Sequence, residues 1–350
     1  IEQLSRTFHL DVDCRARIES LSVGLQQRVE ILKILYRRAN LLILDEPTPV
    51  LTPQEVEEFF GTIRQLKKEG KTVILITHKL SEVMAISDRV TVMRHGRVVG
   101  EVETASTNAR ELARMMVGDD VGLPIEKTSC TTPGPAVRIQ HLSAVNDRNL
   151  PVVRDVSFSI SGGEILGIAA VEGNGQSELV QVLAGLRPAT GGVTTVGGRT
   201  IRPGARGAQI SHIPEDRIKF GIILDFTIAE NLILGRHREP EFSRFLRMRR
   251  TAIDLYAART IGAFDVRPAD RELPAGSLSG GNQQKVVIGR ELSKETDFII
   301  ACQPTRGLDI RAIEFVHHAM IRARNRGKAI LLVSSDLSEL LSISDRIAVM

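Results

Sequence analysis

The chain has 350 residues, of which 42% are hydrophobic and 25% are charged. This length suits roughly two domains of about 150 residues, and the composition is that of a soluble globular protein, not of a disordered, collagen-like or coiled-coil chain. The net charge of +4 is only weak evidence for an anionic partner. Three scattered cysteines argue against a disulfide framework or a zinc site and indicate a reducing compartment. No apolar run approaches the ~18 residues of a membrane-spanning helix.

Apolar segments of strand length alternate with longer amphipathic segments along the chain. Strands are predicted over residues 41–44, 73–76, 165–169, 298–301 and 330–333, and helices over residues 53–68, 177–184 and 283–292. The strands lack polar alternation, which is typical of strands buried on both faces of a parallel sheet. Residues 90–99 have the pattern of a hairpin. The predicted fold class is therefore α/β.

The second half of the chain repeats the first. The heptapeptide that begins at Leu21 returns at Leu278, and Ile-Ser-Asp-Arg at Ile86 returns at Ile343, with a constant offset of 257 positions (278 against 21, 343 against 86). So long a period indicates two copies of one domain, not a solenoid. The predicted domains are residues 1–117 and 136–350, joined by a linker at 118–135 that is rich in Gly, Pro, Ser and Thr.

Two acids follow the first predicted strand. Ligands of α/β sheets bind at the carboxyl ends of the strands, so Asp45 is predicted to hold Mg²⁺ through water and Glu46 to polarise the attacking water. His78 follows the next strand and is a second catalytic candidate, against the alternative that a lone histidine is structural. The matching positions of the second copy hold Cys302, Gln303 and Ser335. All three functional groups are therefore missing from that copy.

A degenerate phosphate loop follows the strand at residues 165–169. Glycines let a backbone wrap phosphates, and the helix that follows offers its amides and its positive dipole. The pattern Gly-x-x-x-x-Gly-Lys-Ser is damaged, because Ala170 replaces the first glycine and Gln176 replaces the lysine. A plain strand-turn-helix corner is an equally good interpretation of this segment alone. The candidate nucleotide-binding residues are Gly173, Gly175, Gln176, Ser177 and Glu178.

Three motifs together carry a family resemblance. Leu-Ser-Gly-Gly-Asn-Gln-Gln at 278–284, Leu-Ile-Leu-Asp-Glu-Pro-Thr at 42–48 and Thr-His-Lys at 77–79 resemble the nucleotide-binding subunits of ABC transporters. The tandem arrangement looks like the double-cassette ATPases of bacterial importers, and residues 172–179 and 213–217 look most like the simple-sugar and purine-nucleoside branch. The resemblance implies tandem P-loop NTPase domains, each with a parallel-sheet core, a helical subdomain and an antiparallel β subdomain.

The same resemblance implies cofactors and partners. It implies ATP and Mg²⁺ as cofactors, and a peripheral location on the cytoplasmic face of the membrane. The partners that it implies are transmembrane permease subunits and, indirectly, a solute-binding protein. It implies no nucleic-acid partner and no transmembrane segment in this chain. Nucleosides are slightly favoured over pentoses as the transported solute.

In that family two cassettes enclose two ATP molecules, each between the phosphate loop of one cassette and the signature motif of the other. The resemblance thus implies that one site combines Asp45, Glu46 and His78 with Ser279, Gly280, Gly281 and Gln283 of the second signature. Ser22 and Gly24, with Val23 interrupting the motif, are expected to complete the degenerate site. Glu215 replaces the family glutamine that senses Mg²⁺ and contacts the permease.

The phosphate loop of the first copy is expected roughly 80 residues before Ile1. The chain is therefore expected to be truncated at both ends and inactive alone, whereas the full-length protein is expected to be an ATPase coupled to transport.

Other interpretations differ in function class. A non-hydrolysing nucleotide-binding fragment remains open, and so does an ABC ATPase acting on ribosomes, although the short linker argues against the latter. A nicotinamide dehydrogenase fails, because Gly173-x-Gly175 lacks the third glycine and the acid that follows. A basic stretch consists of Arg236, Arg238, Arg244, Arg247, Arg249 and Arg250. It is expected on a solvated helical face, and the alternative is contact with a permease or with anionic lipid. His317 and His318 are expected at the surface.

Overall fold

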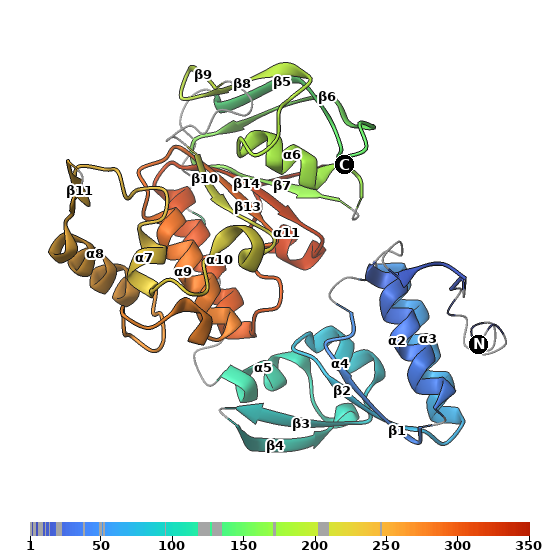
Figure 1. Cartoon of the computed structure of the whole chain (residues 1–350). Coiled ribbons are helices and arrows are strands. Elements are labelled where there is room, and N and C mark those ends of the chain that lie inside the picture. The colour runs from blue at the N-terminus through green and yellow to red at the C-terminus, as the bar shows by residue number, and fades with distance from the viewer. Residues whose placement is uncertain are drawn as a thin grey trace. The chain divides into compact units, whose positions relative to one another are not determined.

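The computed structural model describes residues 1–350 apart from residues 1, 3–4, 6–9, 11, 14, 19–22, 38, 49–50, 52, 95, 118–126, 128–134, 171–172, 202–209 and 246. It divides into two compact units (Figure 1), unit 1 with residues 1–123 and unit 2 with residues 124–350. The divide falls within the segment 118–135.

Unit 1 contains a two-stranded parallel sheet. Strand β1 (Leu41–Asp45) pairs with β2 (Thr72–Ile76), and Asp45 lies opposite Ile76. Helices α2 (Val23–Tyr36) and α3 (Pro53–Lys68) lie beside this sheet (Figure 1). Their apolar side chains are buried in one cluster with those of β1. The other elements are α4 (Leu80–Ile86), the antiparallel pair β3 (Arg89–Arg94) and β4 (Arg97–Glu103), a 3-10 turn (Thr104–Ser106) and α5 (Ala109–Val117).

Unit 2 is built on a five-stranded parallel sheet in the order β10-β13-β14-β7-β15. The strands are β7 (Ile165–Ala169), β10 (Ile210–Ile213), β13 (Phe298–Cys302), β14 (Ala329–Ser334) and β15 (Arg346–Val349). Every residue of β7, β13 and β14 is buried, because apolar layers cover both faces of the sheet.

One layer combines an antiparallel sheet with a short helix. The antiparallel sheet has the order β6-β5-β8-β9 and consists of β5 (Pro135–Val145), β6 (Pro151–Ser161), β8 (Gly191–Val196) and β9 (Arg199–Ile201). Helix α6 (Gln176–Leu183) lies between this sheet and the parallel core (Figure 1).

Helices form the other layer of unit 2. They are α7 (Ile228–Leu232), α8 (Arg250–Ala263), α9 (Gly280–Leu292), α10 (Ile310–Asn325) and α11 (Leu337–Ile343). Short elements complete the unit: β11 (Ser243–Arg244), β12 (Arg247–Met248), a π-helical turn (Arg217–Gly221) and a 3-10 turn (Ala275–Ser277). Asp309 and Asp336 cap α10 and α11, because their carboxylates accept hydrogen bonds from backbone amides of the first turn.

The predicted fold class is confirmed, with a parallel core, a helical part and an antiparallel β part. The periodicity also places α3 and β7 at the observed bounds. Helix α9 begins three residues earlier than predicted, at Gly280. Its first turn is Gly-Gly-Asn, which has no apolar residue to carry a helical period, so hydrophobic patterning cannot detect it.

The two units differ in how their sheets are covered. In unit 1 one face of the β1–β2 sheet is open, with side chains 47–59% exposed at Leu41, Ile43, Ile74 and Ile76. The matching residues of unit 2 lie beneath α6 and the antiparallel strands and are 0–1% exposed. These residues are Phe298, Ile300, Leu331 and Val333. Unit 1 therefore presents an apolar face of the kind that unit 2 covers.

Candidate functional site

The centre of the candidate site in unit 1 is a contact between Glu46 and His78. Glu46 follows β1 directly, and its amide donates to the carbonyl of Ile76 at 2.8 Å. The chain after β2 brings His78 beside it, with His78 Nδ1 2.8 Å from Glu46 Oε1. The side chains of Glu46 and His78 are 39% and 16% exposed. An accessible carboxylate held by an imidazole is an arrangement suited to accept a proton from water.

Asp45 lies at the same edge of the sheet. It is the last residue of β1, at the carboxyl end, and is exposed. Mg²⁺ in phosphate-transfer sites is held by one or two carboxylates together with substrate phosphates. The single accessible carboxylate of Asp45 fits this role. The described residues contain no cluster of three or more His, Cys, Asp or Glu that could hold a metal ion without such phosphates.

The matching edge of unit 2 has the same backbone geometry, but it lacks the general base. The Gln303 amide donates to the Val333 carbonyl at 2.8 Å, and Gln303 Nε2 donates to Ser335 Oγ at 3.1 Å. Gln303 and Glu46 also share a left-handed backbone, with φ of 45° and 42°. The pair at this edge therefore keeps its position, while neither an amide nor a hydroxyl acts as a base near neutral pH.

Cys302 takes the place of Asp45 in unit 2. Its side chain is 3% exposed, and burial raises the pKa of the thiol to about 12. This residue therefore stays a neutral thiol at physiological pH. Because only a thiolate binds metal ions strongly, it offers no ligand to Mg²⁺. The loss of a general base and the loss of a metal ligand coincide at this edge of unit 2.

The phosphate-loop candidates of unit 2 lie at the end of β7 and the beginning of α6. Gly173 and Gly175 adopt left-handed backbones with φ of 97° and 94°, and Gly175 is the N-cap of α6. A Cβ on Gly175 would lie 2.6 Å from the Val152 carbonyl oxygen, so only glycine fits there. Gln176 is 9% exposed, and its Oε1 is buried without a hydrogen-bond partner among the described residues. Ser177 and Glu178 are in the first turn of α6, and both are half-buried.

The second signature motif lies at the beginning of α9. Ser279 is the exposed N-cap residue, and its hydroxyl accepts a hydrogen bond from Asn282 Nδ2 at 3.0 Å. Gly280 and Gly281 form the first turn, and a Cβ on Gly280 would meet the Arg217 guanidinium at 2.6 Å. Gln283 is buried and donates to the carbonyls of Ala275 and Leu278, so its amide supports the loop from within. The exposed Ser279 hydroxyl thus lies at a helix N-terminus, where anions bind.

The first signature is described only in part. Ser22 lies outside the described residues, and Gly24 lies in the first turn of α2. Helix α2 begins at Val23, the position that matches Gly280 at the beginning of α9. The two signatures therefore begin a helix at the same point of the repeat.

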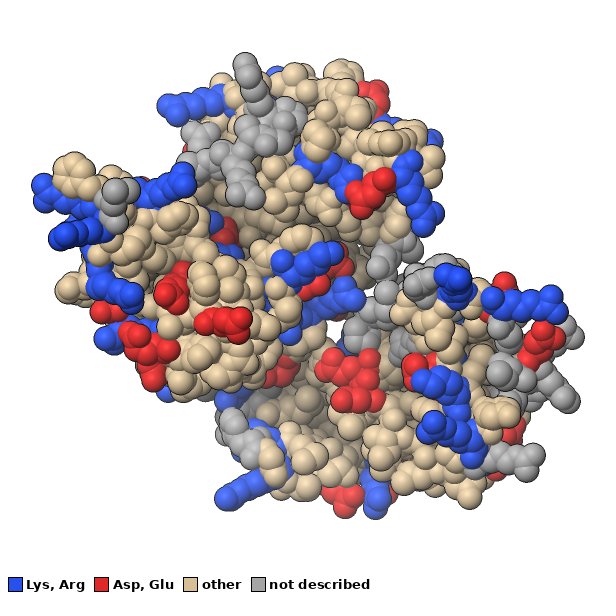
Figure 2. Space-filling model, in the orientation of Figure 1, with Lys and Arg blue, Asp and Glu red and all other residues tan. Residues whose placement is uncertain are grey.

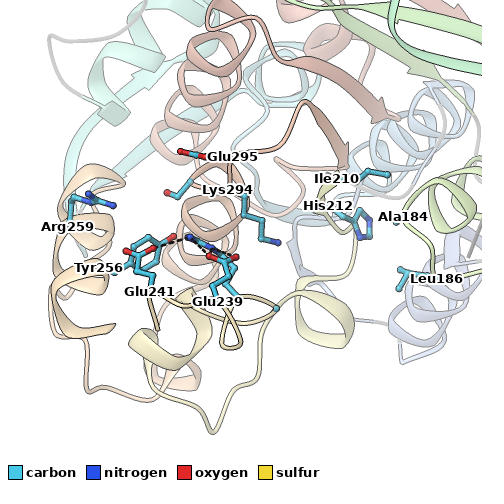
Figure 3. A pocket seen from close by; sticks show the side chains of 13 residues that line it. Ala184, Leu186, Ile210, His212, Glu239, Glu241, Tyr256, Arg259, Lys294 and Glu295 are labelled. Carbon is cyan, nitrogen blue, oxygen red and sulfur yellow. Dashed lines mark hydrogen bonds and ion pairs between the residues drawn. The ribbon is translucent and has the colours of Figure 1, made fainter. Parts of the chain in front are cut away.

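A cavity of about 780 Å³ lies elsewhere in unit 2 (Figure 3). Glu239, Glu241 and Tyr256 gather at one end of it and His212 lies at the other. It lies beyond the C-terminal end of α9, away from the signature at the N-terminal end of that helix. Burial lowers the pKa of His212 to about 4, so this imidazole is neutral at physiological pH. The cavity is not part of the nucleotide edge.

The expected basic surface is only partly present. Arg236 is not on a solvated face: its guanidinium packs 5.0 Å from the Phe242 ring and 5.1 Å from the Tyr256 ring and pairs with Glu239. The two rings and the carboxylate replace part of the water around this guanidinium, whose side chain is 15% exposed. The other arginines of the stretch are exposed around β11 and β12, where Figure 2 shows blue side chains. They are Arg238, Arg244, Arg247, Arg249 and Arg250.

Two further expectations concern His317 and Glu215. The expectation of a surface position is wrong for His317, whose side chain is 13% exposed and lies 3.1 Å from Glu339 Oε1. Glu215 pairs with Arg306 at 2.6 Å, so a carboxylate at this position has a cationic partner in the same unit. Among the described residues no helix is long and apolar enough to cross a membrane.

The sequence matches proteins of known family. A family model described as ABC transporter matches residues 1–49 and 153–306. The nucleoside import ATP-binding protein NupA of Lactococcus lactis is 43% identical over 100% of this chain and 70% of its own length. The guanosine import ATP-binding protein NupO of Bacillus subtilis is 44% identical over 100% and 69%, and the glucose import ATP-binding protein TsgD13 of Haloferax volcanii is 41% identical over 100% and 64%.

Solved structures show the same fold at lower identity. An archaeal ribosome recycling factor, solved with a ribosomal stalk protein, is 21% identical, with a TM-score of 0.67 over 99% of this chain and 65% of its own. A dimeric bacterial ABC transporter cassette is 20% identical, with a TM-score of 0.53 over 61% of this chain and 94% of its own. At such identities the likeness concerns the fold alone. The chain spans roughly two thirds of the length of the import ATP-binding relatives that it matches.

Proposed function

Because this chain belongs to the ABC transporter family of ATP-binding proteins, we propose that it is part of the ATPase subunit of a bacterial importer for nucleosides. The observation that carries the proposal is the Glu46–His78 contact beside Asp45, set against its inert counterpart in unit 2. The two relatives at 43% and 44% identity bear names for nucleoside and guanosine import, ahead of the glucose importer at 41%.

The chemistry of unit 1 follows from these side chains. When bound, ATP with Mg²⁺ supplies the phosphoryl group and a metal that neutralises its charge. Asp45 would hold the metal, and Glu46 would accept the proton of the attacking water. His78 uses Nδ1 to orient the Glu46 carboxylate at 2.8 Å, which leaves its other ring nitrogen for a further hydrogen bond. Phosphoryl transfer depends chiefly on such positioning and electrostatics.

Unit 2 binds a nucleotide without hydrolysing it. Gly173, Gly175 and the N-terminal turn of α6 support phosphate binding, because a Cβ position on Gly173 has no atom within 4 Å and a helix N-terminus favours anions. Gln176 lacks the charge of the lysine that it replaces, and Cys302 and Gln303 offer neither metal ligand nor base. Its role is to stabilise the nucleotide-bound protein while unit 1 hydrolyses ATP. The pairing of each signature with the opposite cassette stays a prediction.

An exposed apolar segment of unit 2 is the surface for the permease. It follows β10 and leaves five large side chains 37–56% exposed: Ile218, Phe220, Ile223, Leu224 and Phe226. The buried side chain of Asn231 fixes this segment, since it accepts from the Ile223 amide and donates to three backbone carbonyls of the segment. A contiguous group of exposed apolar side chains is typical of a protein interface. This contact holds the protein at the cytoplasmic face of the membrane and, through the permease, near a solute-binding protein.

The test is uptake by vesicles that contain the full-length protein and its permease. ATP-dependent accumulation of radiolabelled guanosine or adenosine is expected, and unlabelled ribose or glucose should not compete. Glu46→Gln serves as the matched control and should abolish uptake with the complex still assembled. Uptake of ribose or glucose with no nucleoside uptake would refute the solute, and ATP-independent uptake would refute the energising role.

A further inference from the structure

A buried carboxylate joins the two segments that carry Glu46 and His78. Glu82 lies in α4 and is only 4% exposed. Its Oε1 accepts a short hydrogen bond from Thr48, two residues after Glu46, and its Oε2 accepts one at 3.0 Å from Thr77, next to His78. One side chain therefore ties both chain segments behind the Glu46–His78 contact. Neither periodicity nor a motif in the sequence marks this residue.

The repeat offers an internal comparison. Glu339 matches Glu82 at the offset of 257 positions and is equally buried, at 4%. Its Oε1 lies 3.1 Å from His317 Nε2, and its Oε2 has no hydrogen-bond partner in the described part of the chain. Ser334, which matches Thr77, accepts a hydrogen bond from the Asp336 amide at 3.1 Å, as Thr77 does from the Lys79 amide, but among the described residues it donates none to Glu339. Among the described residues, the carboxylate in unit 2 therefore makes no counterpart of the hydrogen bonds by which Glu82 joins the two segments.

Substitutions at two positions accompany the difference. Lys79 lies 3.5 Å from Glu82 Oε1 in unit 1, and Asp336 occupies its position in unit 2. The position of His317 is occupied in unit 1 by Phe60, which is 3% exposed and cannot hydrogen bond to a carboxylate. In unit 2 the imidazole occupies one oxygen of the buried carboxylate, at 3.1 Å, a contact that the phenyl ring of Phe60 cannot make in unit 1. Among the described residues, the carboxylate hydrogen bonds to both segments only in unit 1, which retains the base and the histidine.

We propose that Glu82 is a positioning residue for ATP hydrolysis, which fixes Glu46 and His78 relative to each other through Thr48 and Thr77, and that His317 has removed this function from unit 2. The proposal rests on the proposed ATPase activity of unit 1. Glu82 touches no reacting atom. It acts by limiting the motion of two neighbouring segments whose side chains must stay in contact.

Three variants of the full-length protein, assembled with its permease, test this role through kcat and KM for ATP. Glu82→Leu removes both hydrogen bonds and is expected to lower kcat about tenfold or more, with KM changed by less than about threefold. Glu82→Gln can accept from one threonine and donate to the other, so kcat should stay within about threefold of wild type. Phe60→His places the competing imidazole in unit 1 and should lower kcat as Glu82→Leu does.

Glu339→Leu is the matched control in unit 2 and is expected to leave kcat within about twofold, because that carboxylate positions no reacting group. Thermal unfolding of each variant separates lost positioning from lost folding. An unchanged kcat in Glu82→Leu, an equal loss in Glu82→Gln, or an equal loss in Glu339→Leu would each overturn the proposal.

A second readout does not depend on ATP hydrolysis. Amide hydrogen exchange at Glu46 and Lys79 reports the two tied segments, since these amides donate to Ile76 and to the Thr77 hydroxyl. Exchange at both should accelerate in Glu82→Leu and not in Glu82→Gln. Unchanged exchange refutes the tether itself. A wild-type protein that hydrolyses no ATP refutes the proposed function, while the exchange data still decide the tether.

Discussion

Replacing Asp345 with alanine is expected to destabilise unit 2 by about 3 kcal/mol. Asp345 accepts two hydrogen bonds from the Arg324 guanidinium, both at 2.9 Å, and a third from the Ile165 amide at 2.8 Å. The side chains of Arg324 and Asp345 are 7% and 22% exposed. Removing one partner of a buried ion pair costs roughly 3–5 kcal/mol, and the partial exposure of Asp345 places this pair at the low end.

The repeat supplies a matched control for this prediction. Lys67 and Asp88 form the corresponding pair in unit 1, with side chains 57% and 71% exposed. Water screens such a pair, so Asp88→Ala should cost at most about 0.5 kcal/mol. In differential scanning calorimetry, Asp345→Ala should lower the Tm of unit 2 by roughly 6–12 °C, and Asp88→Ala should shift the transition of unit 1 by less than about 3 °C. Equal shifts would refute the argument that burial sets the strength of the pair.

Three further predictions concern unit 2. Because the pKa of Cys302 is about 12, iodoacetamide at pH 8 should alkylate this thiol only after urea is added, and rapid labelling of the folded protein would contradict its burial. Because the pKa of His212 falls from 6.5 to about 4 on folding, protons favour the unfolded chain, and about 3 kcal/mol of stability should be lost as pH falls through this window. Urea unfolding at pH 7 and pH 4.5 should show a smaller loss for His212→Gln than for wild type, and equal losses would count against the buried neutral imidazole. Gly175→Ala should lower the Tm of unit 2 and weaken nucleotide binding more than Gly173→Ala, because only the former meets a backbone oxygen, that of Val152, at 2.6 Å. The opposite order in thermal unfolding and nucleotide titration would contradict the contact.

The sequence predicts the buried core of the fold well, for a physical reason. Strands β7 and β13 are buried on both faces, so their residues are apolar without interruption and the pattern is visible in the chain itself. The constant offset of the repeat also identifies Cys302 and Gln303 as the counterparts of Asp45 and Glu46. Local patterning and internal repetition are sufficient for these features.

Local sequence patterns cannot predict contacts between residues that are distant in the chain. Glu82 and Thr48 are 34 positions apart, and nothing local to α4 shows that its glutamate is buried against another loop. The surface position predicted for His317 is wrong for the same reason, because its partner Glu339 lies 22 positions away. A charged residue on a short helix normally faces water, so only the packed structure shows the exception.

The most direct test of the central claim, that only one of the two cassettes hydrolyses ATP, compares Glu46→Gln with Gln303→Ala. The measurement is steady-state ATP hydrolysis by the full-length protein assembled with its permease. A general base contributes roughly 10²–10⁴-fold, so Glu46→Gln should lower turnover at least a hundredfold. Gln303→Ala removes a side-chain amide that bonds to Ser335 and offers no base, so it should leave turnover within about twofold. Equal reductions by the two substitutions would contradict the account.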